Sequence, residues 1–262
     1  MSDAPILLSI DSATATLTFN RPQAGNAIDL PLARALLQAA IRCDTDPAIR
    51  CVVLTGAGKL FCGGGDVQAF SAAGDQVSSY LSELAGTLHM AVTRLMRMAK
   101  PLLVLVNGPA AGAGLSLAIC GDMVLAARSA HFTAAYGMVG LSPDGGMSWL
   151  LPRLIGMRRA QAMIIGNQRV SANEAEAIGL VTRTVDDAAL LSEGANLAEK
   201  LTSSATEAIG AARALLLESY DGALEAQLER ETRSITARGA SPECREGVAA
   251  FLGRRKPDFR RV

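Results

Sequence analysis

Two glycine-rich segments, each placed directly after a short apolar strand and before a helix, constrain the fold of this chain most strongly. Residues 62–65 (Cys-Gly-Gly-Gly) follow the apolar run 49–55, and residues 111–114 (Ala-Gly-Ala-Gly) follow the run 102–106. A glycine can adopt positive φ and lets a ligand approach the backbone closely. Because strand, loop and helix recur in this order, we expect an α/β fold with right-handed crossovers between parallel strands.

The pattern of apolar residues predicts the other elements of this fold. We expect strands at 6–10, 15–19, 49–55, 102–106 and 123–127, and helices at 30–43, 78–98, 115–120, 188–201, 205–219, 223–237 and 242–252. Asp29 is placed to cap the first helix, and Ser171 with Glu174 forms a capping box further along. Repeated strand–loop–helix units favour a spiral of sheet turns, although periodicity alone leaves an open doubly wound sheet as the alternative.

Composition and charge exclude several classes of protein. The chain has 262 residues with 25 basic and 25 acidic side chains, so a general nucleic-acid or membrane-surface role, which needs a basic excess, is not expected. Five scattered cysteines and two histidines predict neither a metal site nor a disulfide framework, and they favour a reducing compartment. With no signal-like N-terminus and no apolar run of spanning length, we expect a cytoplasmic protein.

The two glycine-rich segments have a chemical interpretation as well as a structural one. Free backbone amides in two such loops, each at the start of a helix, can converge on one negatively charged oxygen. A donor in an oxyanion hole of this kind commonly lowers a barrier by ~2.7–4 kcal/mol. Neither segment matches a phosphate loop or a dinucleotide fingerprint. The alternative is that both are only tight turns.

The order of several motifs extends this interpretation. They are Asn20-Arg21-Pro22 with Asn26-Ala27, residues 61–66, residues 106–114, residues 140–146 and residues 246–251. With these motifs the chain resembles the enoyl-CoA hydratase/isomerase (crotonase) superfamily over almost its full length. The resemblance implies a crotonase-type spiral of ββα units with an acyl-CoA site over residues 1–200. It also implies a helical C-terminal trimerisation region over residues 201–262.

The resemblance further implies roles for particular residues. The oxyanion amides would be those of Gly65 and Ala113. Gly63 would lie near the adenine, the segment with Ala27 and Ile28 along the pantetheine, and Phe251 with Arg254 against the CoA of a neighbouring subunit. The full implied set of substrate-binding residues is Ala27, Ile28, Cys62, Gly63, Asp66, His89, Tyr136, Phe251 and Arg254. Coenzyme A is part of the substrate, so no separate cofactor is implied, and the expected assembly is a homotrimer or a dimer of trimers.

The residue types available for proton transfer narrow the expected reaction. A hydratase of this family uses two glutamates, and their positions fall here at Ser116 and Tyr136, neither of which is a carboxylate base near neutral pH. Asp144, in a Pro-Asp-Gly-Gly sequence, remains as the candidate base, with helix capping as its structural alternative. Family members that keep this pattern, the enoyl-CoA isomerases similar to 1,2-epoxyphenylacetyl-CoA isomerase, use the aspartate as their single base. One base suffices to shift a double bond, so the resemblance favours an isomerase.

Several alternatives stay open from the sequence. The chain could be a hydratase or a CoA-thioester hydrolase, or a family member that has lost catalysis. His89 could be an ordinary helix histidine, or it could act with Asp144 as in a chlorobenzoyl-CoA dehalogenase of the same superfamily. Cys62 could be a nucleophile, but without a nearby His or Asn pattern a packing role is favoured.

Overall fold

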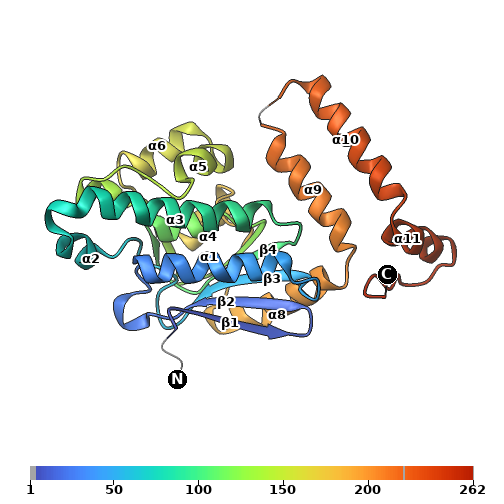
Figure 1. Cartoon of the computed structure of the whole chain (residues 1–262), viewed down its shortest axis with the longest axis horizontal. Helices are drawn as coiled ribbons and strands as arrows, with labels where there is room; N and C mark the ends of the chain where they lie inside the picture. The colour runs from blue at the N-terminus through green and yellow to red at the C-terminus, as the bar shows by residue number, and fades with distance from the viewer. Residues whose placement is uncertain (1–3, 221, 262) are drawn as a thin grey trace.

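A six-stranded sheet forms the centre of the protein (Figure 1). The structure is a computed structural model that describes residues 4–220 and 222–261. The strand order of the sheet is β1-β2-β3-β4-β6-β9, with β1 and β2 antiparallel and the other pairs parallel. The strands are β1 (Ile6–Asp11), β2 (Thr14–Phe19), β3 (Cys51–Gly56), β4 (Leu102–Val106), β6 (Met123–Ala127) and β9 (Arg183–Val185). The predicted α/β class with parallel crossovers is confirmed.

A second, three-stranded sheet lies beside the first and was not predicted from the sequence. It has the order β5-β7-β8 and consists of β5 (Ala110–Ala111), β7 (His131–Thr133) and β8 (Val170–Ser171). These strands have two or three residues each, too few for alternating hydrophobicity to identify them. Because β5 lies inside the second glycine-rich loop, this small sheet fixes the position of that loop relative to the core.

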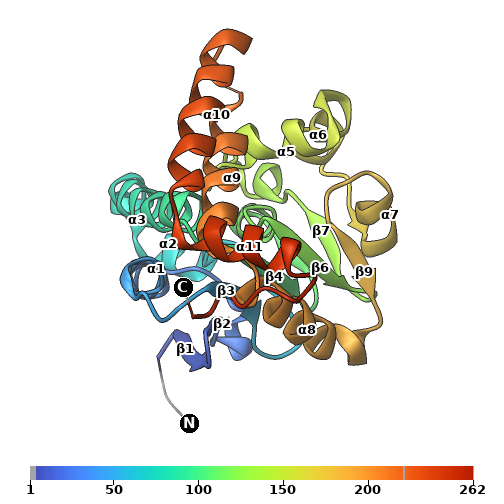
Figure 2. The same ribbon diagram turned by 90° about the vertical axis from the view of Figure 1, so that its right-hand side faces the viewer.

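Helices connect the strands and cover the main sheet on both sides (Figures 1 and 2). The crossover helices α1 (Leu30–Thr45) and α3 (Val77–Arg97) pack against each other, and α8 (Leu190–Thr202) packs against β3, β4 and β6 from the opposite side. The shorter helices are α2 (Val67–Ala72), α4 (Ala113–Ala118), α5 (Met147–Ile155), α6 (Met157–Ile164) and α7 (Ala172–Ala177). The predicted cap at Asp29 is confirmed, since its side chain accepts from the amide of Leu32. Of the predicted capping box, the serine half is confirmed, since Ser171 accepts from the amide of Glu174.

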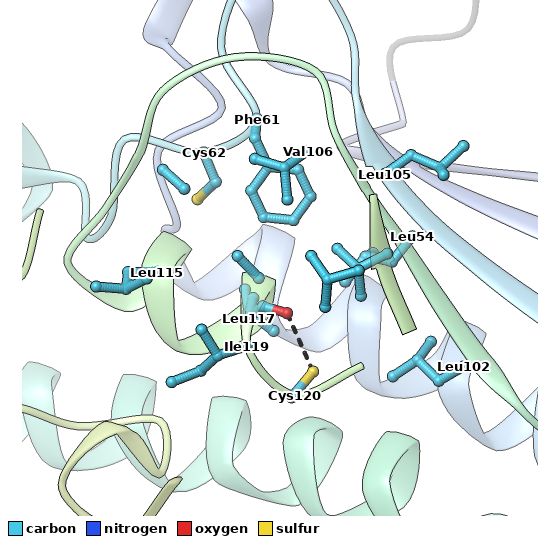
Figure 3. Close-up of a cluster of buried hydrophobic side chains, with 14 of the residues drawn as sticks. Leu54, Phe61, Cys62, Leu102, Leu105, Val106, Leu115, Leu117, Ile119 and Cys120 are labelled. Atoms are coloured by element: carbon cyan, nitrogen blue, oxygen red, sulfur yellow. Dashed lines mark hydrogen bonds between the residues drawn. The ribbon is translucent and has the colours of Figure 1, made fainter. Parts of the chain in front are cut away.

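The core directly beneath the glycine-rich segments is closely packed and apolar (Figure 3). Leu54 of β3, Val106 of β4 and Leu117 of α4 are fully buried, and Phe61 packs edge-on against Phe19. Cys120 is also buried, with its thiol donating to the carbonyl of Leu117. Burial of such side chains commonly contributes about 1.5–3 kcal/mol each. The two loops therefore rest on a rigid foundation.

Three C-terminal helices project from the core as a separate arm (Figures 1 and 2). They are α9 (Thr206–Glu218), α10 (Leu224–Gly239) and α11 (Pro242–Leu252). Arg213 anchors the arm, because its buried guanidinium donates to the carbonyls of Leu95, Met98 and Lys100 at the end of α3. Helix α10 buries no residue, while Leu228, Ile235 and other large apolar side chains of the arm are exposed. Among the described residues, no helix is long and apolar enough to cross a membrane.

Candidate active site

The two glycine-rich segments lie against each other at the carboxyl ends of β3 and β4. The amide of Ala111 donates to the carbonyl of Cys62 at 3.0 Å, and the amide of Cys62 donates to Pro109 at 3.3 Å. Gly64 has φ +99°, and a Cβ built on it would lie 2.9 Å from the carbonyl oxygen of Ala111. Position 64 therefore requires glycine for two reasons, its positive φ and the close approach of another backbone segment.

The amides of Gly65 and Ala113 are free donors at this junction. Within residues 4–220 and 222–261, neither amide is paired with an acceptor. Ala113 is the first residue of α4, where an amide has no partner inside the helix. Both residues line the same cavity, so their N–H groups are available to an oxygen bound there. This geometry supports the predicted oxyanion hole.

Polar side chains support the first glycine-rich segment through hydrogen bonds and ion pairs. Asn26 is fully buried, and its amide nitrogen donates to the carbonyls of Ala57, Leu60 and Phe61. Arg21 forms ion pairs with Asp29 at 3.0 Å and with Asp66 at 3.1 Å. Arg21, Asn26 and Asp66 belong to the motifs that carry the family resemblance, and their contacts show that they hold the backbone in shape. The sequence already contained a sign of this supporting role, because these polar residues stand beside a predicted apolar strand.

A cavity of about 400 Å³ opens next to the two free amides. Its wall consists of Ile28, Gly63, Gly64, Gly65, Val67, Phe70, Leu81, Leu84, Ala85, Leu88, Gly112, Ala113, Ala135, Tyr136, Met138, Val139, Leu141, Ser142 and Asp144. Apart from Tyr136 and Asp144, the side chains that line it cannot ionise. From α3, His89 was predicted to bind substrate, but the residues that line the cavity are Leu81, Leu84, Ala85 and Leu88. Neither these residues nor Phe70, whose ring lies against Gly65, were predicted, because helical apolar spacing does not separate pocket walls from core.

Asp144 enters this cavity from the loop before α5. Its Oδ1 accepts from the hydroxyl of Tyr136 at 2.6 Å, and its backbone carbonyl accepts from Ser116 Oγ at 2.8 Å. The capping alternative for Asp144 is wrong: Gly146 is the N-cap of α5, and no side chain caps that helix. Burial and the adjacent carboxylate raise the pKa of Tyr136 above its usual value, so its hydroxyl stays protonated and serves as a donor.

His89 approaches Asp144 from α3 without lining the cavity. Its Nε2 accepts from the amide of Gly145 at 3.0 Å and lies 3.8 Å from Asp144 Oδ2. The ring borders a separate groove between α1 and α3 and is about half exposed. Through this hydrogen bond, His89 holds the loop that carries Asp144.

The other predicted substrate-binding residues occupy different surroundings. Cys62 is fully buried, and burial raises the pKa of its thiol to about 12, which fits packing rather than nucleophilic attack. Asp66 caps α2 by accepting from the amides of Gln68 and Ala69. The carbonyl of Ala27 accepts from Arg21. In the described part of the chain, no cluster of three or more His, Cys, Asp or Glu side chains could hold a metal ion.

Two further predicted residues lie far from the cavity, on the C-terminal arm. Phe251 in α11 is 83% exposed, and Arg254 follows two residues after that helix ends. Neither lines the cavity of this chain. A large exposed aromatic side chain on a helix with little burial is typical of an interaction surface. The structure of one chain therefore leaves both residues available to another molecule.

Comparisons with known proteins agree with this geometry. Residues 9–261 match the family described as enoyl-CoA hydratase/isomerase. The chain is 36% identical to the 1,2-epoxyphenylacetyl-CoA isomerase of Escherichia coli K12, with 97% of each chain covered. It is 30% identical to a 4-chlorobenzoyl coenzyme A dehalogenase of an Arthrobacter species, over 95% of this chain and 91% of that one. A solved enoyl-CoA hydratase from Polaromonas sp. JS666 superposes with a TM-score of 0.93 at 34% identity, covering 97% and 98%.

Proposed function

The chain belongs to the enoyl-CoA hydratase/isomerase family, whose members act on CoA thioesters, and from that premise we propose that it is an enoyl-CoA isomerase with a single aspartate base. The observation that carries this proposal is that Asp144 is the one carboxylate among the described residues that line the cavity. Tyr136 and Ser116, at the positions of a hydratase's two glutamates, hydrogen-bond to Asp144. Isomerisation requires one base, and hydration requires a positioned water as well.

The proposed reaction moves one proton and one double bond. Asp144 takes a proton from the α-carbon of a β,γ-enoyl thioester, and the C–H electron pair enters the conjugated system. The thioester oxygen becomes the oxyanion of a dienolate, which the amides of Gly65 and Ala113 stabilise. The protonated Asp144 then returns the proton to the γ-carbon, and the product is the α,β-enoyl thioester. Enzyme and proton are restored at the end of each turnover.

A second candidate function uses His89. Its Nε2 lies 3.8 Å from Asp144 Oδ2, and the similarity to a chlorobenzoyl-CoA dehalogenase makes hydrolytic or substitution chemistry the natural alternative. Two observations weigh against it. Nε2 is occupied as an acceptor for Gly145, and the ring borders the groove rather than the cavity. The isomerase proposal therefore has stronger support.

The direct test is to supply the purified protein with cis- and trans-3-enoyl-CoA and, separately, with crotonyl-CoA. An isomerase raises the ultraviolet absorbance of the 3-enoyl thioesters, because the product is conjugated, and leaves crotonyl-CoA unchanged. Rapid loss of crotonyl-CoA absorbance would instead identify a hydratase. Release of free CoA would identify a hydrolase, and the absence of change with every thioester would support a member that has lost catalysis.

The C-terminal arm supports a proposal about assembly. We infer that copies of this chain form a homotrimer or a dimer of trimers, in which Phe251 and Arg254 reach the CoA of a neighbouring subunit. The supporting observations are the exposed apolar side chains of the arm, namely Leu216, Leu224, Leu228, Ile235, Val248, Phe251 and Leu252. Light scattering coupled to size exclusion measures the mass directly. A monomer at micromolar concentration would contradict this assembly.

A further inference from the structure

Tyr136 has a contact that proton transfer by Asp144 alone does not explain. Its hydroxyl donates to Asp144 Oδ1 at 2.6 Å, in the range typical of a strong hydrogen bond to an ionised carboxylate. Ser116 Oγ lies 3.3 Å from the same hydroxyl. The ring of Tyr136 forms part of the cavity wall. The phenol and the carboxylate that it binds therefore lie side by side in the cavity wall.

The backbone holds Tyr136 in this position. The preceding residue, Ala135, has φ +62° in the left-handed region, which is rare for a residue with a Cβ and costs energy. Its amide donates to Asn167 Oδ1 at 2.8 Å, and that bond fixes the strained turn. A strained residue persists only where its surroundings determine it strongly. The direction of the phenol is thus set by the fold and not by free rotation of a surface loop.

The peptide between Asp144 and Gly145 is hydrogen-bonded through both its carbonyl and its amide. Its carbonyl accepts from Ser116 at 2.8 Å, and its amide donates to His89 at 3.0 Å. Gly145 has φ +62°, and a Cβ built on it would lie 2.8 Å from the Cβ of Ser116, so only glycine allows this approach. With the peptide clamped and Oδ1 bound to Tyr136, the carboxylate of Asp144 has little freedom to rotate.

The remaining oxygen, Oδ2, is left free by these contacts. Among the described residues it accepts no hydrogen bond, and His89 Nε2 lies 3.8 Å from it. We propose that Tyr136 is a positioning residue that engages Oδ1 of Asp144 and so presents Oδ2 as the atom that takes and returns the substrate proton. This proposal rests on the proposed isomerase function, since it assigns which oxygen of the base reacts.

The hydrogen bond also has an electrostatic consequence. A donor to a carboxylate stabilises its charged form, so a change of the donor at position 136 is expected to change the pH dependence of catalysis. The titratable groups that face Asp144 are Tyr136 from the turn after β7 and His89 from α3. Burial and the adjacent carboxylate raise the pKa of Tyr136, so the phenol stays protonated and remains a donor in the working range.

The test is the pH dependence of isomerisation by Tyr136→Phe. Loss of the donor should move the acidic limb of kcat/KM up by about one pH unit and lower kcat by about tenfold, with KM changed by less than about threefold. Site-specific 3-fluorotyrosine at the same position, a stronger donor, should move the limb in the opposite direction. This second variant keeps the ring and its packing, so it also tests the proposal if the Phe variant does not fold.

Controls separate this proposal from the function on which it rests. Tyr220→Phe removes a phenolic hydroxyl from an exposed site away from the cavity and should leave the pH profile unchanged. Asp144→Asn is assayed in parallel. If Asp144→Asn is inactive but both Tyr136 variants keep the wild-type limb and kcat, then Tyr136 only packs and the positioning role is wrong. If Asp144→Asn stays active, the single-base isomerase itself is overturned.

Discussion

The two sides of the cavity are built from different parts of the polypeptide. On the proposed oxyanion side, the function is assigned to the backbone amides of Gly65 and Ala113, and the loops that carry them rest on fully buried residues such as Leu54 and Leu117. On the proposed base side, the function is assigned to the side chain of Asp144, and Met138, which also lines the cavity, is 74% exposed. The oxyanion side depends on the path of the backbone, and the base side depends on which side chain occupies each position.

This difference has a chemical meaning. A backbone amide is the same in every residue except proline, so the oxyanion side can tolerate side-chain changes and still stabilise an enolate-like oxygen. A base depends on one carboxylate and on the groups that surround it. The relatives named isomerase, hydratase and dehalogenase share the fold at 30–36% identity. We therefore expect the loops of the base side to decide which of these reactions a chain performs.

The largest effect should come from removing the base. Asp144→Asn keeps the size of the side chain and an acceptor oxygen for Tyr136, but it cannot take a proton. We expect kcat to fall by about 10²–10⁴, the usual contribution of a general base. Binding of a 3-enoyl-CoA thioester, measured by calorimetry, should stay within about threefold because the cavity wall is otherwise intact. Activity near the wild-type level would show that the base side has another catalyst.

The next effect should come from the opposite side of the cavity. Only proline removes a backbone donor, and Ala113 is the first residue of α4, where proline is well tolerated. We expect Ala113→Pro to lower kcat by about 10²–10³, the cost of one oxyanion donor. Circular dichroism and the melting temperature should stay close to those of the wild type. A fully active Ala113→Pro variant would remove that amide from the oxyanion hole.

A smaller effect, on stability, should distinguish the rigid loops from the base-side loop. A Cβ on Gly114 would lie 2.2 Å from the carbonyl oxygen of Cys62, so Gly114→Ala must push the two glycine-rich segments apart. We expect a loss of about 1–3 kcal/mol in the free energy of unfolding, as for other overpacked sites. Gly137→Ala is the matched control in the base-side turn, because nothing lies within 4 Å of its Cβ. If urea titration gave equal free energies of unfolding for Gly114→Ala and Gly137→Ala, the expected difference between the rigid loops and the base-side loop would be wrong.

The smallest effect should come from His89. In His89→Gln the amide oxygen can still accept from Gly145, so the clamp on the Asp144 peptide is kept while the imidazole base is lost. We expect isomerase kcat to change by less than about threefold, as for surface substitutions that leave contacts intact. A fall of about 10² or more would instead give His89 a direct role, as in the dehalogenase-like alternative. Steady-state kinetics with 3-enoyl-CoA measures this.

Much of the fold could be predicted because its signals are local. The caps at Asp29 and Ser171 involve residues three apart, and the helix predicted at 242–252 has the bounds found for α11. Strands buried on both faces are continuous apolar runs, which the sequence displays directly. The short second sheet and helix α2 were missed because two to six residues carry too little pattern. The spiral arrangement needed the family resemblance, and the structure and its relatives confirm it.

The candidate site, like the fold, has a part that could be predicted from the sequence and a part that could not. The glycines at 64 and 112 and the lone aspartate at 144 can be identified in the sequence, because φ above zero and a carboxylate are properties of single residues. The contacts of Tyr136, Ser116 and His89 with the loop of Asp144 join positions up to 56 residues apart. No local pattern encodes such a distance, since it follows from how strands and helices pack.

By itself, then, the sequence determined where this chain could form an oxyanion hole and which carboxylate was left to act as a base. Only the tertiary structure decided that Asp144 is not a helix cap, that Oδ1 is bound to Tyr136, and that His89 faces the loop as an acceptor. The physical reason is that backbone conformation follows from local sterics, whereas the freedom and charge of a side chain depend on neighbours that folding brings from distant parts of the chain.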